Sequence, residues 1–195
     1  MSIENNFIFY LKPMFVETIQ GKNLSYQEIK NIFQIWANTF GDGTIKKDKK
    51  IQFTDEVIFL IRDKNTNILA LGCLHQIYAN FLWKPYIIQW IGGIVSVVKG
   101  KWYGKIIMTE IRTYVCKNKL TAIGFCSKHN TPFYEKCDFL IKKWGITRFV
   151  TKDAEWNIHY TTDTVDDVLY LDAKDCLMKN VFLHPKAKVY VPRFW

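Results

Sequence analysis

Residues 86–104 limit most strongly what this chain can fold into. The first part of the stretch is an almost unbroken apolar run, which is typical of a β-strand covered on both faces. The second part precedes a helical pattern and carries glycines among lysines: Gly100 and Gly104 with Lys99, Lys101 and Lys105. Backbone N–H groups, positive charge and a helix N-terminus therefore converge at one turn, which suits a bound diphosphate.

The helical pattern after this turn indicates how the turn is held. Apolar Ile107, Ile111, Tyr114 and Val115 recur at i, i+4, i+7 and i+8, so one face of the helix packs on the sheet. The first turn of that helix then faces the glycine loop. An isolated Gly-x-x-x-Gly is more often a solvated basic turn between a core strand and a core helix, so a phosphate site needs a second motif.

The composition bounds the size and the partner of the chain. With 195 residues, 49% of them hydrophobic, the chain suits one well-packed domain and is too apolar for a disordered protein. Its formal net charge of +9 favours an anionic partner. The lysines are scattered rather than gathered on one helix or arm, which makes nucleic acid a weak candidate. A phosphorylated cofactor or a phosphate-bearing acceptor explains the sign of the charge equally well.

Cysteine usage and the N-terminal sequence bear on the compartment. The five cysteines are odd in number and form no Cys-x-x-Cys, so neither a metal site nor a disulfide framework is predicted. Cysteines within apolar runs act as small core residues and suit a reducing compartment. Neither a signal peptide nor a membrane span is visible in the sequence, so a cytoplasmic protein is expected.

The patterns before and after this stretch predict further strands and helices. A capping box of Ser25 and Glu28 opens a helix that runs to Phe40. A turn rich in Asn and Asp at residues 63–67 joins two strands, and a wide loop is expected at residues 81–85. Strands are expected at residues 7–15, 57–62, 68–78, 120–126, 138–141 and 168–171.

The segments after the central helix complete the order of elements. The strand at residues 120–126 is expected to run parallel to the strand before the glycine loop, after a right-handed crossover. Asn130 is expected to cap a short helix with Pro132 in its first turn. The basic and aromatic residues 179–195 fit no class of element.

A second motif follows the strand at 120–126 and reads Asn130-x-x-Phe133-Tyr134-Glu135-Lys136-Cys137-Asp138-Phe139. Together with the antiparallel strands, the glycine turn and the crossover helix, it resembles the GCN5-related N-acetyltransferases (GNAT) over residues 57–139. The pyrophosphate motif of that family corresponds to residues 99–104. Here Lys99 replaces an Arg or Gln of the motif, Trp102 stands at its first glycine, and Asp138 replaces a later glycine.

The resemblance implies an α/β (α+β) fold with a mixed, mostly antiparallel central sheet of about six to seven strands and helices on both faces. It also implies a single domain over residues 1–195. Within it, residues 1–56 would form an N-terminal strand and an acceptor-side helix, residues 57–143 the acetyl-CoA core, and residues 144–195 a C-terminal strand and tail.

The resemblance further implies acetyl-CoA as co-substrate and no metal. Main-chain groups of Gly92 and Ile94 would bind its pantetheine. The loop that would bind its pyrophosphate consists of Lys99, Gly100, Lys101, Trp102, Tyr103, Gly104 and Lys105. Tyr134 would protonate the leaving thiolate, and Asn130 would hydrogen-bond the cofactor or hold the turn of Tyr134. Taken without the upstream loop, Tyr134 is more often a core tyrosine with a satisfied hydroxyl, and the two motifs in this order favour the catalytic role.

The acceptor implied by the resemblance is a primary amine of a small molecule. The second motif is similar to that of glucosamine-phosphate N-acetyltransferases, and the end of the chain is similar to that of aminoglycoside 2'-N-acetyltransferases. An amino sugar or a nucleotide-linked amino sugar is therefore expected, and phosphate on it would match the positive charge. Protein or peptide N-acetylation and a catalytically degenerate GNAT-fold binding module remain alternatives, and a homodimer is left open.

An amine with a pKa of about 10.4 must lose a proton before it attacks a thioester. The candidate bases are Asp42, His75, Glu110 and the carboxylate of Trp195. Asp42 belongs to a segment, residues 40–42, that resembles an acidic acceptor loop. His75 lies in an apolar strand, where a structural histidine is more common. The sequence therefore leaves the base unassigned.

Overall fold

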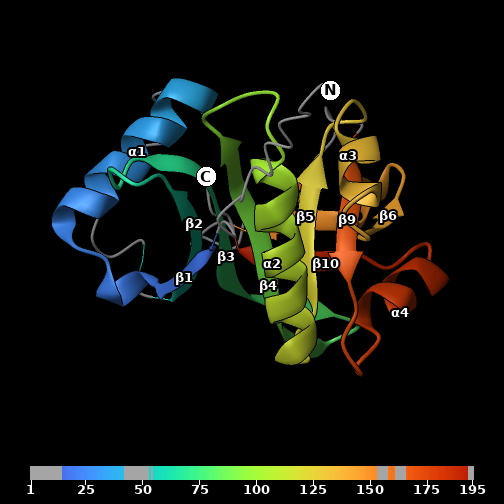
Figure 1. Cartoon of the computed structure of the whole chain (residues 1–195). Coiled ribbons are helices and arrows are strands. Elements are labelled where there is room, and N and C mark those ends of the chain that lie inside the picture. Colours follow the sequence, from blue (N-terminus) through green and yellow to red (C-terminus); the bar gives the residue numbers. More distant parts are fainter. Residues whose placement is uncertain (1–14, 42–52, 54, 153–157, 161–165, 193–195) are drawn as a thin grey trace, which may run out of the picture.

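The computed structural model of the chain describes residues 15–41, 53, 55–152, 158–160 and 166–192, which form one mixed sheet with helices on both faces (Figure 1). Within those residues the sheet has ten strands. Eight follow the order β6-β9-β5-β4-β3-β10-β7-β8, and off this path β2 pairs with β3 and β1 pairs with β2. Two pairs, β4 with β5 and β7 with β10, are parallel, and the others are antiparallel. The predicted fold class is confirmed, although the sheet is larger than expected.

The centre of the sheet is the predicted antiparallel meander of β2 (Glu56–Arg62), β3 (Ile68–Phe81) and β4 (Lys84–Ser96). In its first turn, Asp63 Oδ1 accepts the backbone N–H groups of Asn65 and Asn67 at 2.8 Å each. The second turn is not the wide loop expected at residues 81–85. Leu82 and Trp83 alone form it, both with positive φ (47° and 65°), and such two-residue turns match the twist of a hairpin.

Helix α2 (Tyr103–Lys117) joins β4 to β5 (Ala122–Cys126), which runs parallel to β4, so the predicted crossover is confirmed (Figure 1). Ile107, Ile111 and Val115 of α2 are each at most 1% exposed and pack on the sheet. Burial of each such side chain stabilises the fold by about 1.5–3 kcal/mol. This packing holds the first turn of α2 in place beside the glycine loop.

Helix α1 (Tyr26–Phe40) begins at the predicted capping box. Ser25 Oγ accepts the Glu28 N–H at 3.3 Å, and Glu28 Oε2 accepts the Ser25 N–H at 2.9 Å. The helix covers the sheet face opposite α2, as alternate residues of β2 show. Val57, Phe59 and Ile61 belong to the apolar cluster under α2, whereas Ile58 and Leu60 belong to the cluster under α1.

Helix α4 (Leu177–Leu183) covers a second area of the α1 face. Along β3, Leu71 and Cys73 belong to the cluster under α1, whereas Ile77 belongs to the cluster under α4. These residues alternate, so their side chains share one face with His75. The α1 face therefore carries two apolar clusters, and His75 lies between them along β3.

The remaining elements are short. They are β1 Glu17–Gln20, the 3-10 turn η1 Gly21–Asn23, α3 Thr131–Glu135, β6 Leu140–Lys142, the 3-10 turn η4 Gly145–Arg148, β7 Phe149–Lys152, β8 Ile158–Tyr160, β9 Asp167–Leu171 and β10 Val189–Pro192. The sequence did not predict β1, β7, β8, β10 or α4. The strand expected at residues 7–15 lies outside the described residues except for Phe15. No helix in the described ranges is long and apolar enough to cross a membrane.

Candidate active site

The parallel strands β4 and β5 separate after two paired positions. Gln89 pairs with Ala122 and Trp90 with Ile123, and beyond them each strand follows only its other neighbour in the sheet. From there on, no ladder bonds join the facing edges of β4 and β5. An extended molecule can bind along such an edge in the manner of an added strand. The opening between β4 and β5 is therefore a candidate binding slot.

A β-bulge bends β4 beside this slot. Residues 92–95 of β4 stand opposite residues 71–73 of β3, so four residues face three. Gly93 takes a φ of +60°, and a Cβ on it would lie 2.5 Å from the ring of Trp36. Trp36 Nε1 donates a hydrogen bond to the Gly93 carbonyl at 2.9 Å. Helix α1 thereby fixes the bend of β4.

The two residues expected to bind pantetheine flank Gly93. The Gly92 carbonyl accepts a hydrogen bond from Cys73 Sγ at 3.2 Å. The side chain of Ile94 lies on the α2 face, where a Cβ on Gly72 would come within 2.6 Å of its Cδ1. Both residues lie on the part of β4 beyond its last pair with β5, so the structure brings them to the slot.

The glycine loop leads from the slot into α2. Gly100 takes a φ of +70° with nothing within 4 Å of a Cβ, so backbone conformation rather than crowding favours glycine there. No side chain of the described residues caps α2, and the first backbone N–H with a helical acceptor is that of Ile106, which donates to the Trp102 carbonyl at 3.0 Å. The N–H groups of residues 103–105 therefore point out of the helix toward the loop.

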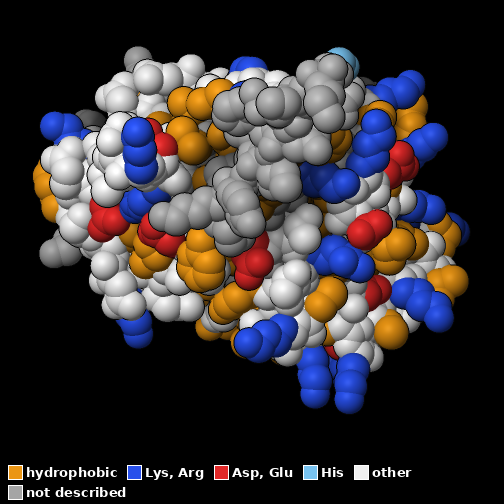
Figure 2. Space-filling model, viewed as in Figure 1, with side chains coloured by type: hydrophobic (Ala, Val, Ile, Leu, Met, Phe, Trp, Pro, Cys, Tyr) orange, Lys and Arg blue, Asp and Glu red, His pale blue; other side chains and the backbone are white. Residues whose placement is uncertain are grey.

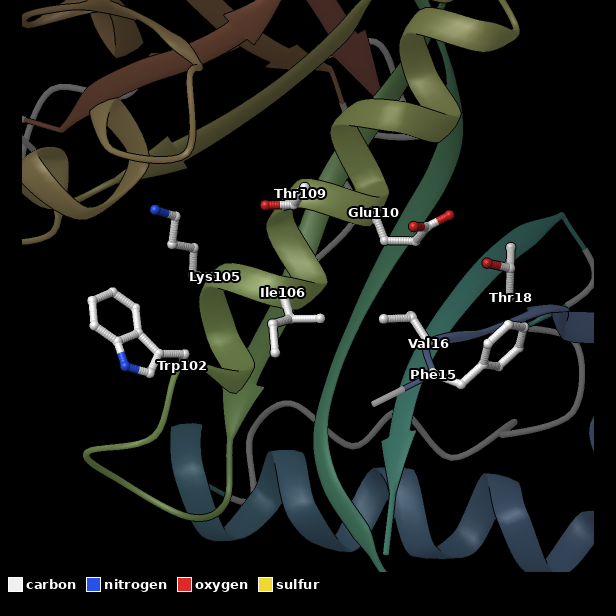
Figure 3. Close-up of a pocket in the computed structure, with 8 residues that line it drawn as sticks. All are labelled: Phe15, Val16, Thr18, Trp102, Lys105, Ile106, Thr109 and Glu110. Atoms are coloured by element: carbon white, nitrogen blue, oxygen red, sulfur yellow. The ribbon is translucent and has the colours of Figure 1, made fainter. Parts of the chain in front are cut away.

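Positive charge surrounds this helix end. Lys99, Lys101 and Lys105 are exposed, and no carboxylate in the described part of the chain forms a salt bridge with them. Lys105 Nζ lies 5.7 Å from the ring centroid of Trp102, whose side chain is 75% exposed, so the indole extends beside α2 into solvent (Figure 3). Further Lys and Arg side chains spread over the half of the surface that carries α2, α3 and α4 (Figure 2).

Helix α3 places Tyr134 next to the glycine loop. A Cβ on Gly104 would lie 3.4 Å from Phe133 Cζ, and the rings of Phe133 and Tyr134 are 5.0 Å apart, edge to face. Burial of the ring raises the pKa of the Tyr134 hydroxyl to about 12. Among the described residues that hydroxyl has no hydrogen-bond partner. The two sequence motifs therefore meet where Phe133 lies beside Gly104, and the Tyr134 ring packs against Phe133.

Comparisons with known proteins bear on this arrangement. No model of a protein family and no curated protein matches the sequence. The structure is similar to ElaA of Escherichia coli, with a TM-score of 0.57 and 12% identity over 82% of this chain and 99% of that one. It is also similar to an acyl-CoA N-acyltransferase of Pseudomonas aeruginosa, with a TM-score of 0.55 and 12% identity over 82% and 100%. The chain has the GNAT fold.

A further GNAT structure has a known amine acceptor. The spermidine/spermine N-acetyltransferase SpeG of Vibrio cholerae matches with a TM-score of 0.50 and 12% identity, over 86% of this chain and 98% of that one. At identities this low, the structural similarity establishes only the common fold. The substrate of this chain must be inferred from its own residues.

In this GNAT fold, Asn130 does not cap α3 as expected. Its Nδ2 donates to Ser127 Oγ at 3.3 Å, and no side chain of the described residues caps the helix. The helix is held instead through Thr131, whose Oγ1 donates to Asp167 Oδ2 at 2.7 Å. Asp167 Oδ1 also accepts the Trp144 N–H at 2.9 Å. Buried Asp167 of β9 therefore anchors α3, and with it Tyr134.

A pocket of about 640 Å³ lies on the outer side of α2 (Figure 3). It is lined by Phe15, Val16, Thr18, Trp102, Lys105, Ile106, Thr109 and Glu110. Trp102 and Lys105 connect it to the glycine loop, whereas Tyr134 is not part of its lining. Glu110, one of the expected base candidates, therefore lies at this pocket and is not brought to Tyr134.

Of the other base candidates, only His75 lies within the described residues. Asp42 and Trp195 lie outside the described residues. His75 is described, and its Nδ1 lies 3.3 Å from Glu56 Oε1. The sequence analysis missed Glu56. Counting outward from the turn at residues 63–67 would place it opposite Leu74, and only the register shift between Ile61 and Arg62 moves it opposite His75.

Asp138 lies at a position where the GNAT motif usually has glycine. Substitutions of Asp138 therefore measure the strain of its backbone conformation. It takes a φ of +60°, a region that Asp tolerates better than most residues, and it forms only a 3.7 Å exposed ion pair with Arg112. We expect Asp138→Gly to raise the free energy of unfolding by up to about 1 kcal/mol and Asp138→Ala to lower it by about 1 kcal/mol, measured by urea denaturation. Equal stabilities of the two variants would contradict this.

Proposed function

We propose that this chain is an acetyl-CoA-dependent N-acetyltransferase that acetylates a primary amine of a small molecule, namely an amino sugar or a nucleotide-linked amino sugar. One observation carries the proposal: the slot between β4 and β5 opens beside a lysine-flanked helix end without a side-chain cap, and α3, which carries Tyr134, meets that loop through Phe133. These features fit the pantetheine, the diphosphate and the sulfur of the co-substrate. When bound, acetyl-CoA supplies the activated acyl thioester.

The residues of the slot and loop would divide the binding. Main-chain groups of Gly92 and Ile94 would hold the pantetheine as an added strand. The N–H groups of residues 101–105 would hold the pyrophosphate, with charge from the flanking lysines. Because the Trp102 indole extends beside α2 rather than into the helix axis, we expect it to leave the helix end accessible to phosphate.

Tyr134 would donate to the sulfur as the C–S bond breaks. With a pKa of about 12, its hydroxyl is protonated at neutral pH and needs no prior charge to donate. Its ring packs against the apolar cluster near Cys126 and Cys137, which limits the access of water to the hydroxyl. We therefore assign the role of general acid to Tyr134.

The charge of the chain supports an acceptor that carries phosphate. Vibrio cholerae SpeG acetylates the polyamines spermidine and spermine, which shows that the GNAT fold can serve cationic acceptors. This chain carries a formal net charge of +9, which would repel a polycation and attract an anionic one. A phosphorylated or nucleotide-linked amino sugar combines the required amine with that negative charge.

Binding of acetyl-CoA is the first prediction of the proposal. We expect isothermal titration to show binding that weakens with salt, and the double variant Lys99→Ala/Lys101→Ala to weaken it roughly three- to tenfold, because each exposed lysine contributes up to about 1 kcal/mol. Lys64→Ala, on the turn between β2 and β3, is the matched control and should bind as the wild type does. An absence of heat at millimolar acetyl-CoA would exclude the enzyme.

The acceptor can be found with a panel of amines. The panel contains glucosamine, glucosamine 6-phosphate, a nucleotide-linked amino sugar, spermidine and a lysine-containing peptide, and thiol release from acetyl-CoA reports turnover. The proposal expects the highest kcat/KM with a phosphate-bearing amino sugar. Fastest turnover with the peptide would instead support protein N-acetylation.

A further inference from the structure

An ionisable pair lies on the sheet face opposite α2, between the two apolar clusters. Glu56 and His75 face each other across β2 and β3, with Glu56 Oε1 3.3 Å from His75 Nδ1. The Glu56 side chain is 12% exposed and the His75 side chain 29%. Glu56 Oε2 is buried and has no hydrogen-bond partner within the described ranges. The His75 side chain is therefore the more exposed member of the pair.

The pair is close to the slot between β4 and β5. On β4, His75 stands opposite Trp90, the last β4 residue that pairs with β5. Opposite residues of antiparallel strands have Cα atoms about 4.5–5.5 Å apart, so His75 lies one strand from the slot. Tyr134 packs in the cluster on the α2 face, whereas the pair lies on the α1 face. The slot thus has an acidic group on one face of the sheet and a basic group on the other.

Stability does not explain the pair. Burial raises the pKa of the Glu56 carboxyl, even though the hydrogen bond and charge of His75 act in the opposite direction. The ionised carboxylate is therefore held at a cost, and buried ion pairs are commonly no more stable than apolar side chains of similar volume. Cys73 also lies near the pair, but burial raises the pKa of its thiol well above the usual value, so it stays neutral. Ionisable groups held in this way are typical of functional sites.

We propose that His75 is the general base that takes a proton from the ammonium group of the acceptor, and that Glu56 is a positioning residue that orients the imidazole and stabilises its protonated form. This inference rests on the proposed acetyltransferase function. It supplies the base that the sequence leaves unassigned. It also predicts that the acceptor approaches from the α1 face, between α1 and α4.

Atoms, protons and electrons balance in the proposed acetyl transfer. His75 Nε2 accepts one proton of the acceptor ammonium, and the nitrogen lone pair then forms the C–N bond to the acetyl carbonyl carbon. The C–S bond breaks with its electrons on the sulfur. The surplus proton of the amide nitrogen reaches the sulfur by way of Tyr134, and the imidazolium of His75 returns its proton to solvent. The products are one amide, one thiol and one proton, with no further reactant.

Turnover as a function of pH tests the base. The variants are His75→Gln and Glu56→Gln, with Glu17→Gln as matched control, because Glu17 forms an ion pair with Arg62 on the neighbouring strand. With the amine that the wild type acetylates fastest, we expect His75→Gln to lower kcat roughly 10- to 100-fold near pH 7 with little change in KM. The loss should shrink toward pH of about 10, where solvent deprotonates the amine. Glu17→Gln should match the wild type.

Two measurements test the role of Glu56. We expect Glu56→Gln to lower kcat by less than His75→Gln does and to leave KM nearly unchanged, because the carboxylate acts through the imidazole and does not contact the substrate. Because folding raises the pKa of Glu56, its ionisation costs stability above that pKa, so Glu56→Gln should melt at the same or a higher temperature than the wild type near pH 8.

The outcomes separate this inference from the function on which it rests. If the wild type acetylates an amine and folded His75→Gln retains its kcat and pH profile, the base assignment is wrong and the acetyltransferase proposal stands. If Glu56→Gln retains the kcat of the wild type, the positioning role is wrong. If the wild type neither binds acetyl-CoA nor releases thiol with any amine, both proposals fail together.

Discussion

Tyr134→Phe should lower kcat roughly 10²- to 10³-fold while the affinity for acetyl-CoA stays the same, because the variant removes only the proton donor to the leaving sulfur. The ring keeps its contacts with Phe133 and the core, so cofactor binding and fold are preserved. The free energy of unfolding should hardly change, since the hydroxyl has no hydrogen-bond partner among the described residues. Single-turnover kinetics and isothermal titration measure the two effects separately.

A second tyrosine controls for the loss of a half-buried phenol. Burial also raises the pKa of Tyr170, but this residue lies in the apolar cluster under α4 rather than near the glycine loop. Tyr170→Phe should therefore retain full kcat. Because the pKa of Tyr134 is about 12, the wild-type kcat should show no fall from its ionisation below about pH 10. Unchanged turnover of Tyr134→Phe would remove Tyr134 from the mechanism.

Gly93→Ala should lower the free energy of unfolding by about 3 kcal/mol or more. A Cβ there would lie 2.5 Å from Trp36 Cζ2 and 2.7 Å from Trp36 Nε1, so the indole must move. The φ of +60° adds strain of about 1–2 kcal/mol, displacement of a packed ring about 1–3 kcal/mol, and loss of the Trp36 hydrogen bond about 1 kcal/mol. Urea denaturation measures the sum.

Gly100→Ala separates strain from crowding at Gly93. Gly100 has a similar φ of +70°, but nothing lies within 4 Å of a Cβ, so we expect Gly100→Ala to cost only about 1–2 kcal/mol. In a Trp36→Leu background, which removes the indole, the cost of Gly93→Ala should fall toward that of Gly100→Ala. Equal costs of the two alanine variants in the wild-type background would show that Trp36 does not confine the bulge.

Local patterns in the sequence predicted the elements around the slot. The capping box at Ser25, the turn at residues 63–67 and the apolar spacing of α2 each depend on residues close in sequence, and the structure has all three. Consecutive elements usually lie side by side in space. The arrangement of the meander, the glycine loop and the crossover helix therefore also follows from their order in the chain. Together with the motif at residues 130–139, these features carried the resemblance to the GNAT family, and the fold that the resemblance implied is confirmed.

The second half of the chain depends on contacts between distant residues. Strand β10 pairs with both β3 and β7, and the Arg148 guanidinium donates to backbone carbonyls of the tail, including that of Val181 at 3.0 Å. Strands of four residues carry too little periodic pattern to be found alone, so their partners decide them. The sequence therefore predicted neither these strands nor α4.

What the sequence by itself determined is the type and order of the elements that build the slot, because spacing, caps and turn residues act within a few residues of the chain. Tertiary structure alone decided which side chains meet around it. Glu56 lies beside His75 through hairpin register, Trp36 is brought to Gly93 from another element, and Trp102 extends beside Lys105. Burial and desolvation, which distinguish the Glu56 and Tyr134 groups from ordinary ones, arise only when distant segments pack together.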